Sequence, residues 1–107
     1  MEIIQYQVIR VNLDPTIGSE IRKIRPCVVI SPDEMNRHLQ TVVIAPMTTS
    51  SKPYPTRIPV TFENTAGWIA LDQLRTIDKS RVVGAFGHLT FAEIQKLKLC
   101  IRQTFID

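Results

Sequence analysis

The sequence predicts a small α+β domain: a strongly bent sheet or barrel of about five or six short strands with one helix packed on it. Short apolar or alternating runs separated by turn residues indicate the strands, and one amphipathic stretch near the C-terminus indicates the helix. Strands do not alternate with helices and the four glycines are scattered, which argues against a parallel nucleotide-binding sheet. A chain of 107 residues, 44% of them apolar, corresponds to one domain, residues 1–107.

The first two predicted strands enclose a charged loop. Residues 5–13 nearly alternate, which indicates a half-buried strand with one apolar face made of Ile9, Val11 and Leu13. The run 26–31 is short and β-branched, and proline is tolerated at the first residue of a strand, so we expect this strand to begin at Pro26. Arg25 is then held at the lip of a rigid element.

The middle of the chain contains a central strand and an edge strand. Residues 31–36 predict a short helical turn, and 41–47 are apolar on both faces, which indicates a central strand. Residues 48–55 are polar and contain two prolines, so we expect an exposed loop. Residues 57–62 form a strand that its proline confines to a sheet edge or a bulge.

The next segment is less clearly patterned. Residues 64–67 predict a turn, and 68–74 together with 75–77 predict one or two strands. Residues 78–82 indicate a helical turn, followed by a loop or short strand at 83–88.

The C-terminal helix is the clearest single element. Thr90 followed by Glu93 has the spacing of a capping box, and Leu89 with Ile94 has that of a hydrophobic staple. The helix should run from about 90 to 104. Its apolar face is predicted to consist of Ile94, Leu97, Ile101 and Phe105.

The charge and the cysteines indicate the kind of partner and the cellular compartment to expect. The net charge of +3 and the pI of about 9.1 indicate a mildly basic surface, which fits a polyanionic partner without requiring one. Cys27 and Cys100 lie in apolar runs, so we expect buried thiols in a reducing compartment. With no membrane-spanning or signal-type segment, a cytoplasmic protein without a membrane partner is expected.

Metal and hydrolase chemistry have little support in the sequence. The only imidazoles are those of His38 and His88, and no His, Cys, Asp or Glu residues show the spacing of metal ligands. No metal or other cofactor is therefore expected. There is no nucleophile elbow, and Cys27 lies within a predicted strand. The remaining candidates are polar residues at strand ends, namely Glu20, Arg25, Thr48, Asp72, Gln73 and Arg75.

This set contains the groups that RNA cleavage without a metal needs. A carboxylate can accept the proton of a 2′-hydroxyl, and an arginine with a hydroxyl can hold the phosphate oxygens. Structural roles fit the same residues: Glu20 can balance neighbouring charges, Asp72 can cap a turn or pair with Arg75, and Trp68 is more often core than a stacking platform. Chemistry alone assigns Arg25 electrostatic stabilisation before proton transfer.

Three ordered blocks resemble the MazF/PemK toxins of bacterial toxin–antitoxin systems. The first is Val11–Glu20 with Arg25–Pro32, the second is Thr41–Lys52, and the third is Asp72–Asp78. The resemblance covers nearly the whole chain. It implies an SH3-like barrel with a C-terminal helix, of the fold that these toxins share with the CcdB toxins, and a homodimer.

The resemblance also implies an activity. Family members are metal-independent endoribonucleases that cut single-stranded RNA, usually mRNA, at short sequences and leave 2′,3′-cyclic phosphate and 5′-hydroxyl ends. A cognate antitoxin neutralises them by laying an acidic C-terminal segment over the RNA groove, in a toxin–antitoxin hetero-oligomer.

Residue by residue, Arg25 matches the family's catalytic arginine and Thr48 its partner threonine. Glu20 occupies a position proposed as base in some members, and Asp72 matches a catalytic aspartate of one branch. Ser19 and Ala70 stand where that branch has a histidine and an arginine, so a scheme built on those two does not transfer.

The groove is expected to be electropositive, because phosphate contacts need cations. The residues expected to bind RNA are Ser19, Arg22, Lys23, Thr49, Ser51, Lys52, Gln73 and Arg75, with Lys79 and Arg81 as further cations and Tyr54 and Trp68 as base-contacting candidates.

An alternative comes from toxins of the same barrel fold that poison DNA gyrase by binding it. Those CcdB-like toxins share a C-terminal Trp-Gly-Ile. This chain ends Thr104-Phe105-Ile106-Asp107 and has its only tryptophan at position 68, which favours the nuclease.

Overall fold

Strand β3 (Thr41–Thr48) organises the fold because it pairs with three other strands. The structure, a computed structural model, describes residues 2–107. The elements, in chain order, are β1 (Gln7–Asn12), β2 (Ile24–Val29), α1 (Asp33–His38), β3, β4 (Arg57–Phe62), β5 (Thr65–Ala70), the 3-10 turn η1 (Leu71–Gln73), β6 (Arg75–Asp78), the 3-10 turn η2 (Lys79–Arg81), β7 (Val82–His88), α2 (Phe91–Ile101) and the π-helical turn η3 (Arg102–Ile106).

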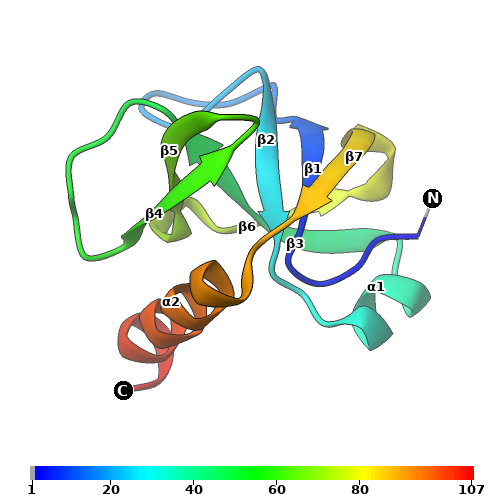
Figure 1. Cartoon of the computed structure of the whole chain (residues 1–107). Coiled ribbons are helices and arrows are strands. Elements are labelled where there is room, and N and C mark those ends of the chain that lie inside the picture. Colours follow the sequence, from blue (N-terminus) through cyan, green and yellow to red (C-terminus); the bar gives the residue numbers. More distant parts are fainter. Residues whose placement is uncertain (1) are drawn as a thin grey trace.

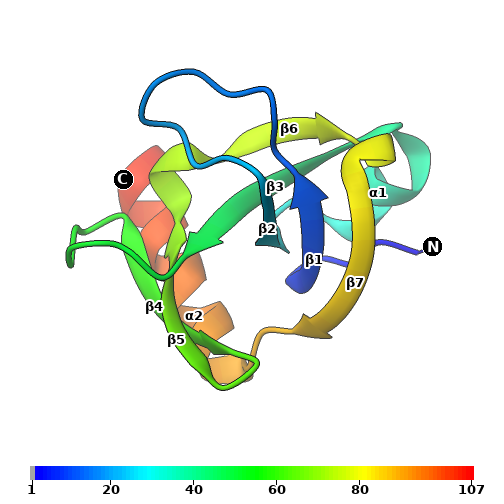
Figure 2. The same cartoon turned by 90° about the horizontal axis from the view of Figure 1, so that it is seen from above.

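The strands form one antiparallel sheet in the order β4-β5-β3-β2-β1-β7, with β6 added beside β3. The start of β3 pairs with β6, where Thr41 faces Asp78, and its end pairs with β5, where Thr48 faces Trp68. Because β3 pairs with β6 at its start and with β5 at its end, the sheet curls into an open barrel (Figure 2). Helix α2 packs beside the β4–β5 hairpin (Figure 1).

Alternation along the strands creates two cores, one on each face of the sheet. Ile9, Val11 and Leu13 are fully buried on one face, as predicted, together with Cys27. The other core faces α2 and contains Val8, Val28, Ala45, Met47, Ile58, Val60, Ile69, Leu71, Leu89, Leu97 and Cys100. Both cysteines are buried and free, as expected.

Strand β2 begins two residues before the predicted start at Pro26. Its first residues pair with β1, where Arg25 faces Val11, whereas the ladder to β3 starts only at Cys27. Pro26 therefore lies where the strand has a single neighbour, and its missing N–H is tolerated there. Arg25 lies inside the strand, and its side chain is exposed.

The β4–β5 hairpin matches the prediction in its first strand and differs in its turn. Pro59 lies on β4, which is an edge strand as expected. The turn consists of Glu63 and Asn64, both with positive φ (51° and 61°), and not of residues 64–67. A two-residue turn with two positive φ angles matches the twist of a hairpin, and it leaves Gly67 inside β5.

The sheet has seven strands, one more than the upper prediction, because residues 82–88 form a complete strand. Residues 68–74 are split: β5 ends at Ala70, and the 3-10 turn η1 follows. The predicted turn near 78–82 is η2, where the Asp78 carboxylate accepts a hydrogen bond from the Ser80 backbone N–H at 2.8 Å.

The predicted capping box starts helix α2. The Thr90 hydroxyl accepts from the Glu93 N–H at 3.2 Å, and the Glu93 carboxylate accepts from the Thr90 N–H at 2.9 Å. The prediction for Phe105 is wrong, since its side chain is 56% exposed. From Arg102 the chain adopts π-helical geometry, which has more residues per turn and rotates Phe105 away from the core.

Two shorter features complete the description. Helix α1 runs from Asp33 to His38, so the predicted turn at 31–36 is present but begins and ends two residues later, with Asp33 in its first turn as expected. Among residues 2–107, no helix is long and apolar enough to cross a bilayer.

Leu97 and Leu99 provide a matched test of the α2 contact. Leu97 is fully buried in the α2-facing core and Leu99 is 54% exposed. Leu97→Ala should lower the free energy of unfolding by about 2–5 kcal/mol, because it removes buried methyl groups and leaves a cavity. Leu99→Ala should change it by less than about 0.5 kcal/mol. Urea unfolding of both variants checks this, and equal effects would contradict the packing.

Candidate active site

One recess brings Arg25 and Thr48 together. It lies between the start of β2, the end of β3 and the β4–β5 hairpin, and has a volume of about 80 Å³. Its walls are Arg25, Pro26, Met47, Thr48, Thr49, Val60, Phe62, Thr65 and Gly67. The two residues singled out from the sequence for the phosphate therefore line one cavity, with apolar side chains beneath them.

Arg25 is anchored by its backbone and leaves most of its guanidinium available. Its main chain pairs with Val11 in the β1–β2 ladder. Its Nε donates to the Arg22 carbonyl at 3.2 Å, the one hydrogen bond that the guanidinium makes within residues 2–107. A planar cation with free donors at the rim of a recess suits a bidentate contact to a phosphate.

Thr48 ends strand β3 and folds the chain back on itself. Its hydroxyl accepts from the Ser50 N–H at 3.2 Å and can donate to the Ser50 carbonyl at 3.3 Å. Gly67 lies against it across the β3–β5 pairing. A Cβ on Gly67 would lie 2.9 Å from the Thr48 carbonyl oxygen, too close for a side chain, so glycine permits this approach of the two strands.

The other predicted residues gather in a neighbouring hollow of about 370 Å³. Its walls are Glu20, Ile21, Pro46, Asp72, Gln73, Leu74 and Arg75. Pro46 lies two positions before Thr48 on β3, so the hollow and the recess follow one another along the same strand.

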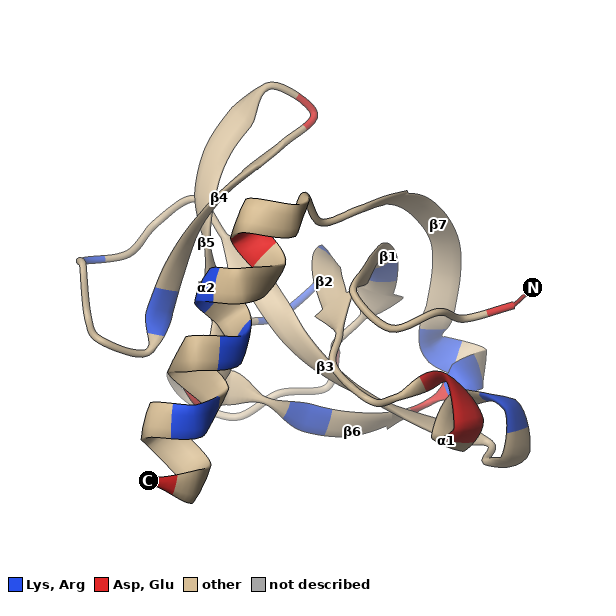
Figure 3. Ribbon diagram, turned by 60° about the horizontal axis from the view of Figure 1, so that its bottom comes forward, with Lys and Arg blue, Asp and Glu red and all other residues tan. Residues whose placement is uncertain are grey.

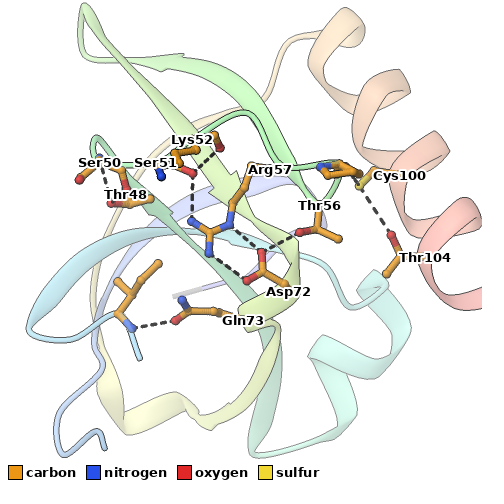
Figure 4. A network of polar contacts seen from close by, with 12 residues as sticks. Thr48, Ser50, Ser51, Lys52, Thr56, Arg57, Asp72, Gln73, Cys100 and Thr104 are labelled. Atoms are coloured by element: carbon orange, nitrogen blue, oxygen red, sulfur yellow. Dashed lines mark hydrogen bonds and ion pairs between the residues drawn. The ribbon is translucent and has the colours of Figure 1, made fainter. Parts of the chain in front are cut away.

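Asp72 is committed to an ion pair with Arg57, a residue that the sequence analysis did not single out (Figure 4). Arg57 Nε and Nη2 donate to the two carboxylate oxygens at 2.7 and 2.9 Å, and the Thr56 hydroxyl adds a bond of 3.0 Å. These hydrogen bonds, with the Arg57 contact first, lower the pKa of Asp72, and the same contact raises the pKa of Arg57. Asp72 is therefore a firmly ionised carboxylate with both oxygens occupied.

The Arg57 network also holds the loop that follows β3. Arg57 Nη1 donates to the Ser51 hydroxyl at 3.1 Å, and that hydroxyl donates to the Lys52 carbonyl at 2.8 Å. The Tyr54 ring lies 5.6 Å from the Arg57 guanidinium. Only long-range pairing across β4 and η1 brings these groups together, so spacing in the sequence could not indicate Arg57.

The charged loop before β2 is braced by two residues that were predicted to contact RNA. Gln73 accepts from the Ile21 N–H at 2.7 Å, and Arg75 donates to the Leu13 carbonyl at 3.3 Å. The Glu20 carboxylate is exposed and accepts from the Ile17 N–H at 2.6 Å.

The remaining predicted contact residues are solvent-facing. Thr49 is exposed and lines the recess, and the side chains of Ser19, Arg22, Lys23 and Lys52 are exposed on the loops before β2 and after β3. Lys79 differs from the expectation, because its ammonium group donates to the Asn36 carbonyl of α1. Arg81 donates to the carbonyls of Asn12 and Asp14.

Thiol chemistry has no place in this site. Cys27 is fully buried, and burial raises the pKa of its thiol to about 12, which keeps it protonated near neutral pH. Within residues 2–107, no three His, Cys, Asp or Glu side chains gather as a metal site would require.

Comparison with known proteins identifies the family. Over residues 4–105 the sequence matches the family described as PemK-like, MazF-like toxin of type II toxin-antitoxin system. The chain belongs to this PemK/MazF toxin family.

Curated relatives agree with this assignment. The chain is 34% identical over 92 residues to the endoribonuclease toxin MazF of Escherichia coli (strain K12), which covers 85% of this chain and 83% of the relative. It is 35% identical over 85 residues to the endoribonuclease EndoA of Bacillus subtilis (strain 168), with 73% and 72% covered.

Solved structures show the same fold. A crystal structure of MazF from Deinococcus radiodurans superposes with a TM-score of 0.84 at 20% identity, covering 96% of both chains. An endoribonuclease in complex with its cognate antitoxin, from a mycobacterial species, gives a TM-score of 0.80 at 22% identity, covering 94% of this chain and 92% of that one. The expected family fold, a curled β-barrel with a C-terminal helix, is confirmed.

The Arg57–Asp72 pair makes a prediction for stability. Asp72→Asn should lower the free energy of unfolding at neutral pH by about 1 kcal/mol, at the low end for a charged hydrogen bond because the carboxylate is 37% exposed. Folding lowers the pKa of Asp72, so its contribution is complete above the unfolded pKa of about 3.9 and is lost as the pH falls through the native pKa. Urea unfolding at about pH 7 and about pH 3 should show a narrowing gap between wild type and variant.

Glu34→Gln serves as the control for this measurement, since Glu34 is an exposed carboxylate on α1. A gap for Asp72→Asn that stays constant across this pH range would contradict the assigned role.

Proposed function

We propose that this MazF-family chain is the toxin of a type II toxin–antitoxin system and acts as a metal-independent endoribonuclease that cuts single-stranded mRNA within a specific sequence. The observation that carries the proposal is the recess in which Arg25 and Thr48 meet, with an exposed guanidinium at its rim. The curated relatives are named endoribonucleases, which favours RNA cleavage over gyrase binding.

The chemistry is an internal transesterification. The 2′-hydroxyl attacks the adjacent phosphorus and gives up its proton, the bond from phosphorus to the 5′-oxygen breaks, and that oxygen takes up a proton from solvent. The products are a 2′,3′-cyclic phosphate and a 5′-hydroxyl. Arg25 and Thr48 bind the non-bridging oxygens, whose negative charge grows in the transition state.

The two predicted carboxylates differ in what they can do here. Asp72 has both oxygens bound and a lowered pKa, so we assign it the positioning of Arg57 and the loop after β3. Glu20 is exposed beside the hollow, so it is the carboxylate we assign to accept the 2′-hydroxyl proton.

The residues predicted to bind RNA also fall into two groups, those that are exposed and those that are hydrogen-bonded within the protein. The exposed residues are assigned to phosphates and bases, namely Ser19, Arg22, Lys23, Thr49 and Lys52. Ser51, Gln73 and Arg75 are bonded to backbone or to Arg57, so they hold the RNA-binding loops in place.

The partners follow from the same proposal. An antitoxin with an acidic C-terminal segment would compete with RNA for the cationic groove, and the active species is a homodimer acting in the cytoplasm. Support comes from fold neighbours of this chain that are described as MazE–MazF complexes from Deinococcus radiodurans.

Arg25→Ala and Thr48→Ala should each reduce RNA cleavage by about 100-fold or more, because each removes a group that binds the transition-state charge. Arg25→Lys should remain impaired, since lysine lacks the planar fork. The measurement is the cleavage rate of a long RNA, with circular dichroism to establish folding. Arg37→Ala, an equal charge change on α1, is the control; wild-type rates for Arg25→Ala would refute the assignment.

Chelation provides a second test of the reaction. Cleavage should proceed at an unchanged rate in EDTA, and every new 5′ end should carry a hydroxyl. Complete loss of cleavage with EDTA would refute the metal-independent scheme. A DNA gyrase supercoiling assay run in parallel should show no inhibition.

Gly67→Ala tests how closely β5 holds the end of β3. The new Cβ would meet the Thr48 carbonyl oxygen at 2.9 Å and push the strands apart, so kcat should fall by about tenfold or more while the protein stays folded. Gly87→Ala is the matched control, because its Cβ would touch only the Phe62 ring at an ordinary 3.8 Å. Equal rates for the two variants would contradict a positioning role.

A further inference from the structure

A third depression lies on the outer face of the β4–β5 hairpin. Its volume is about 520 Å³, and its walls are Thr49, Pro59, Val60, Thr61, Ala66, Gly67, Trp68, Glu93 and Lys96. It shares Thr49, Val60 and Gly67 with the recess that holds Arg25. The outer depression therefore continues from the candidate active site around the hairpin.

Strand register places Trp68 beside Thr48. Trp68 is directly opposite Thr48 on β3 and Pro59 on β4. Directly opposed residues in an antiparallel pair have their side chains on the same face, about 5 Å apart at Cβ. The indole is partly exposed and lines the depression. Trp68 is thus only partly a core residue, and part of its ring faces the depression.

The lining contains one carboxylate, Glu93, and one ammonium group, Lys96, so its formal charges balance. Both oxygens of Glu93 are occupied, because they accept from the Thr90 and Thr61 N–H groups at 2.9 and 3.2 Å. Lys96 is exposed at the α2 side of the depression, and the ribbon of α2 carries several basic positions (Figure 3). Arg25 supplies an exposed cation in the adjoining recess.

An aromatic surface between cations is the arrangement that binds single-stranded nucleic acid, since bases stack on the ring while phosphates reach the cations. We propose that Trp68 is the stacking platform for a nucleobase adjacent to the scissile phosphate, and that Lys96 binds the phosphate on the far side of that nucleotide. The proposal rests on the proposed function, because it extends the RNA path from Thr48 along Thr49 to α2.

The chain's single tryptophan makes the proposal directly measurable. Oligodeoxythymidylate and oligodeoxyadenylate, which lack the attacking 2′-hydroxyl, serve as uncleavable probes, and an abasic oligonucleotide of equal length supplies phosphates without bases. Binding is followed by anisotropy of a terminal fluorescein. Base-bearing probes should quench Trp68 fluorescence saturably, whereas the abasic probe should bind without quenching. Binding of the base-bearing probes without quenching would overturn the proposal.

Kinetics provide an independent readout. Trp68→Ala should raise KM for RNA roughly 5- to 100-fold with kcat nearly unchanged, the range expected for one lost base stack, and Trp68→Phe should restore most of the affinity. Circular dichroism and thermal unfolding establish that each variant is folded. An unchanged KM for Trp68→Ala, or a fall in kcat alone, would contradict stacking.

Lys96 and Lys98 form a matched pair on α2. Lys96 lines the outer depression, whereas Lys98 lines a separate hollow with Tyr6 and Ile101. Lys96→Ala should weaken binding and reduce the slope of log K against log salt by about 0.7, the value for one lost phosphate contact on a single strand. Lys98→Ala should leave that slope unchanged, and equal slopes for both variants would contradict the assigned path.

The two proposals fail in different ways. If wild-type protein does not cleave RNA, the proposed function is wrong. If it cleaves RNA while Trp68 is neither quenched by bases nor needed for KM, only the stacking platform is wrong.

Discussion

The pairing of β3 with three strands is the constraint on which the rest of the structure depends. β2 pairs with one edge of β3 from Ile44 to Pro46, while β6 and β5 share the other edge in succession. Each backbone ladder fixes the position of a polar residue that sequence separation alone leaves undetermined. Arg25 lies on β2 two residues before the ladder to β3 begins at Cys27, Thr48 ends β3, and Asp72 lies in the turn between β5 and β6. Side chains from three distant segments therefore meet along one strand, without any local motif that joins them.

The second level of organisation is polar and centres on Arg57. A guanidinium that donates to both oxygens of Asp72 and to Ser51 ties the loop after β3 to the turn η1. This contact explains why the carboxylate expected to act in proton transfer has the properties of a structural group. The proposed cleavage is correspondingly left to residues whose polar groups are exposed, chiefly Arg25 and Glu20. The Arg57 hydrogen bonds hold the backbone around the recess in place, and the Arg25 guanidinium at its rim stays exposed.

Much of this fold could be predicted from the sequence where a local signal exists. Thr90 and Glu93 define the start of the helix, Pro59 marks an edge strand, and the resemblance to MazF indicated Arg25 and Thr48 before their proximity was visible. Features that depend on non-local contact could not be predicted. The hairpin turn at Glu63 follows from the register of β4 and β5, and the same register places Arg57 opposite Ala70, within reach of Asp72. The exposure of Phe105 depends on a change of helical geometry that the apolar spacing does not encode.

The free edge of β4 has a consequence for how copies of this protein behave when crowded. An unpaired strand edge normally offers its amide groups as a template for another chain. Alternate residues of β4 direct their N–H groups to this edge, and each is accounted for: Arg57 donates to the Tyr54 carbonyl, Pro59 has no N–H, and Thr61 donates to Glu93. A strand of another chain that approaches this edge of β4 therefore meets no free backbone N–H. The same carboxylate that starts α2 therefore also covers an N–H that a pairing strand from another chain would need.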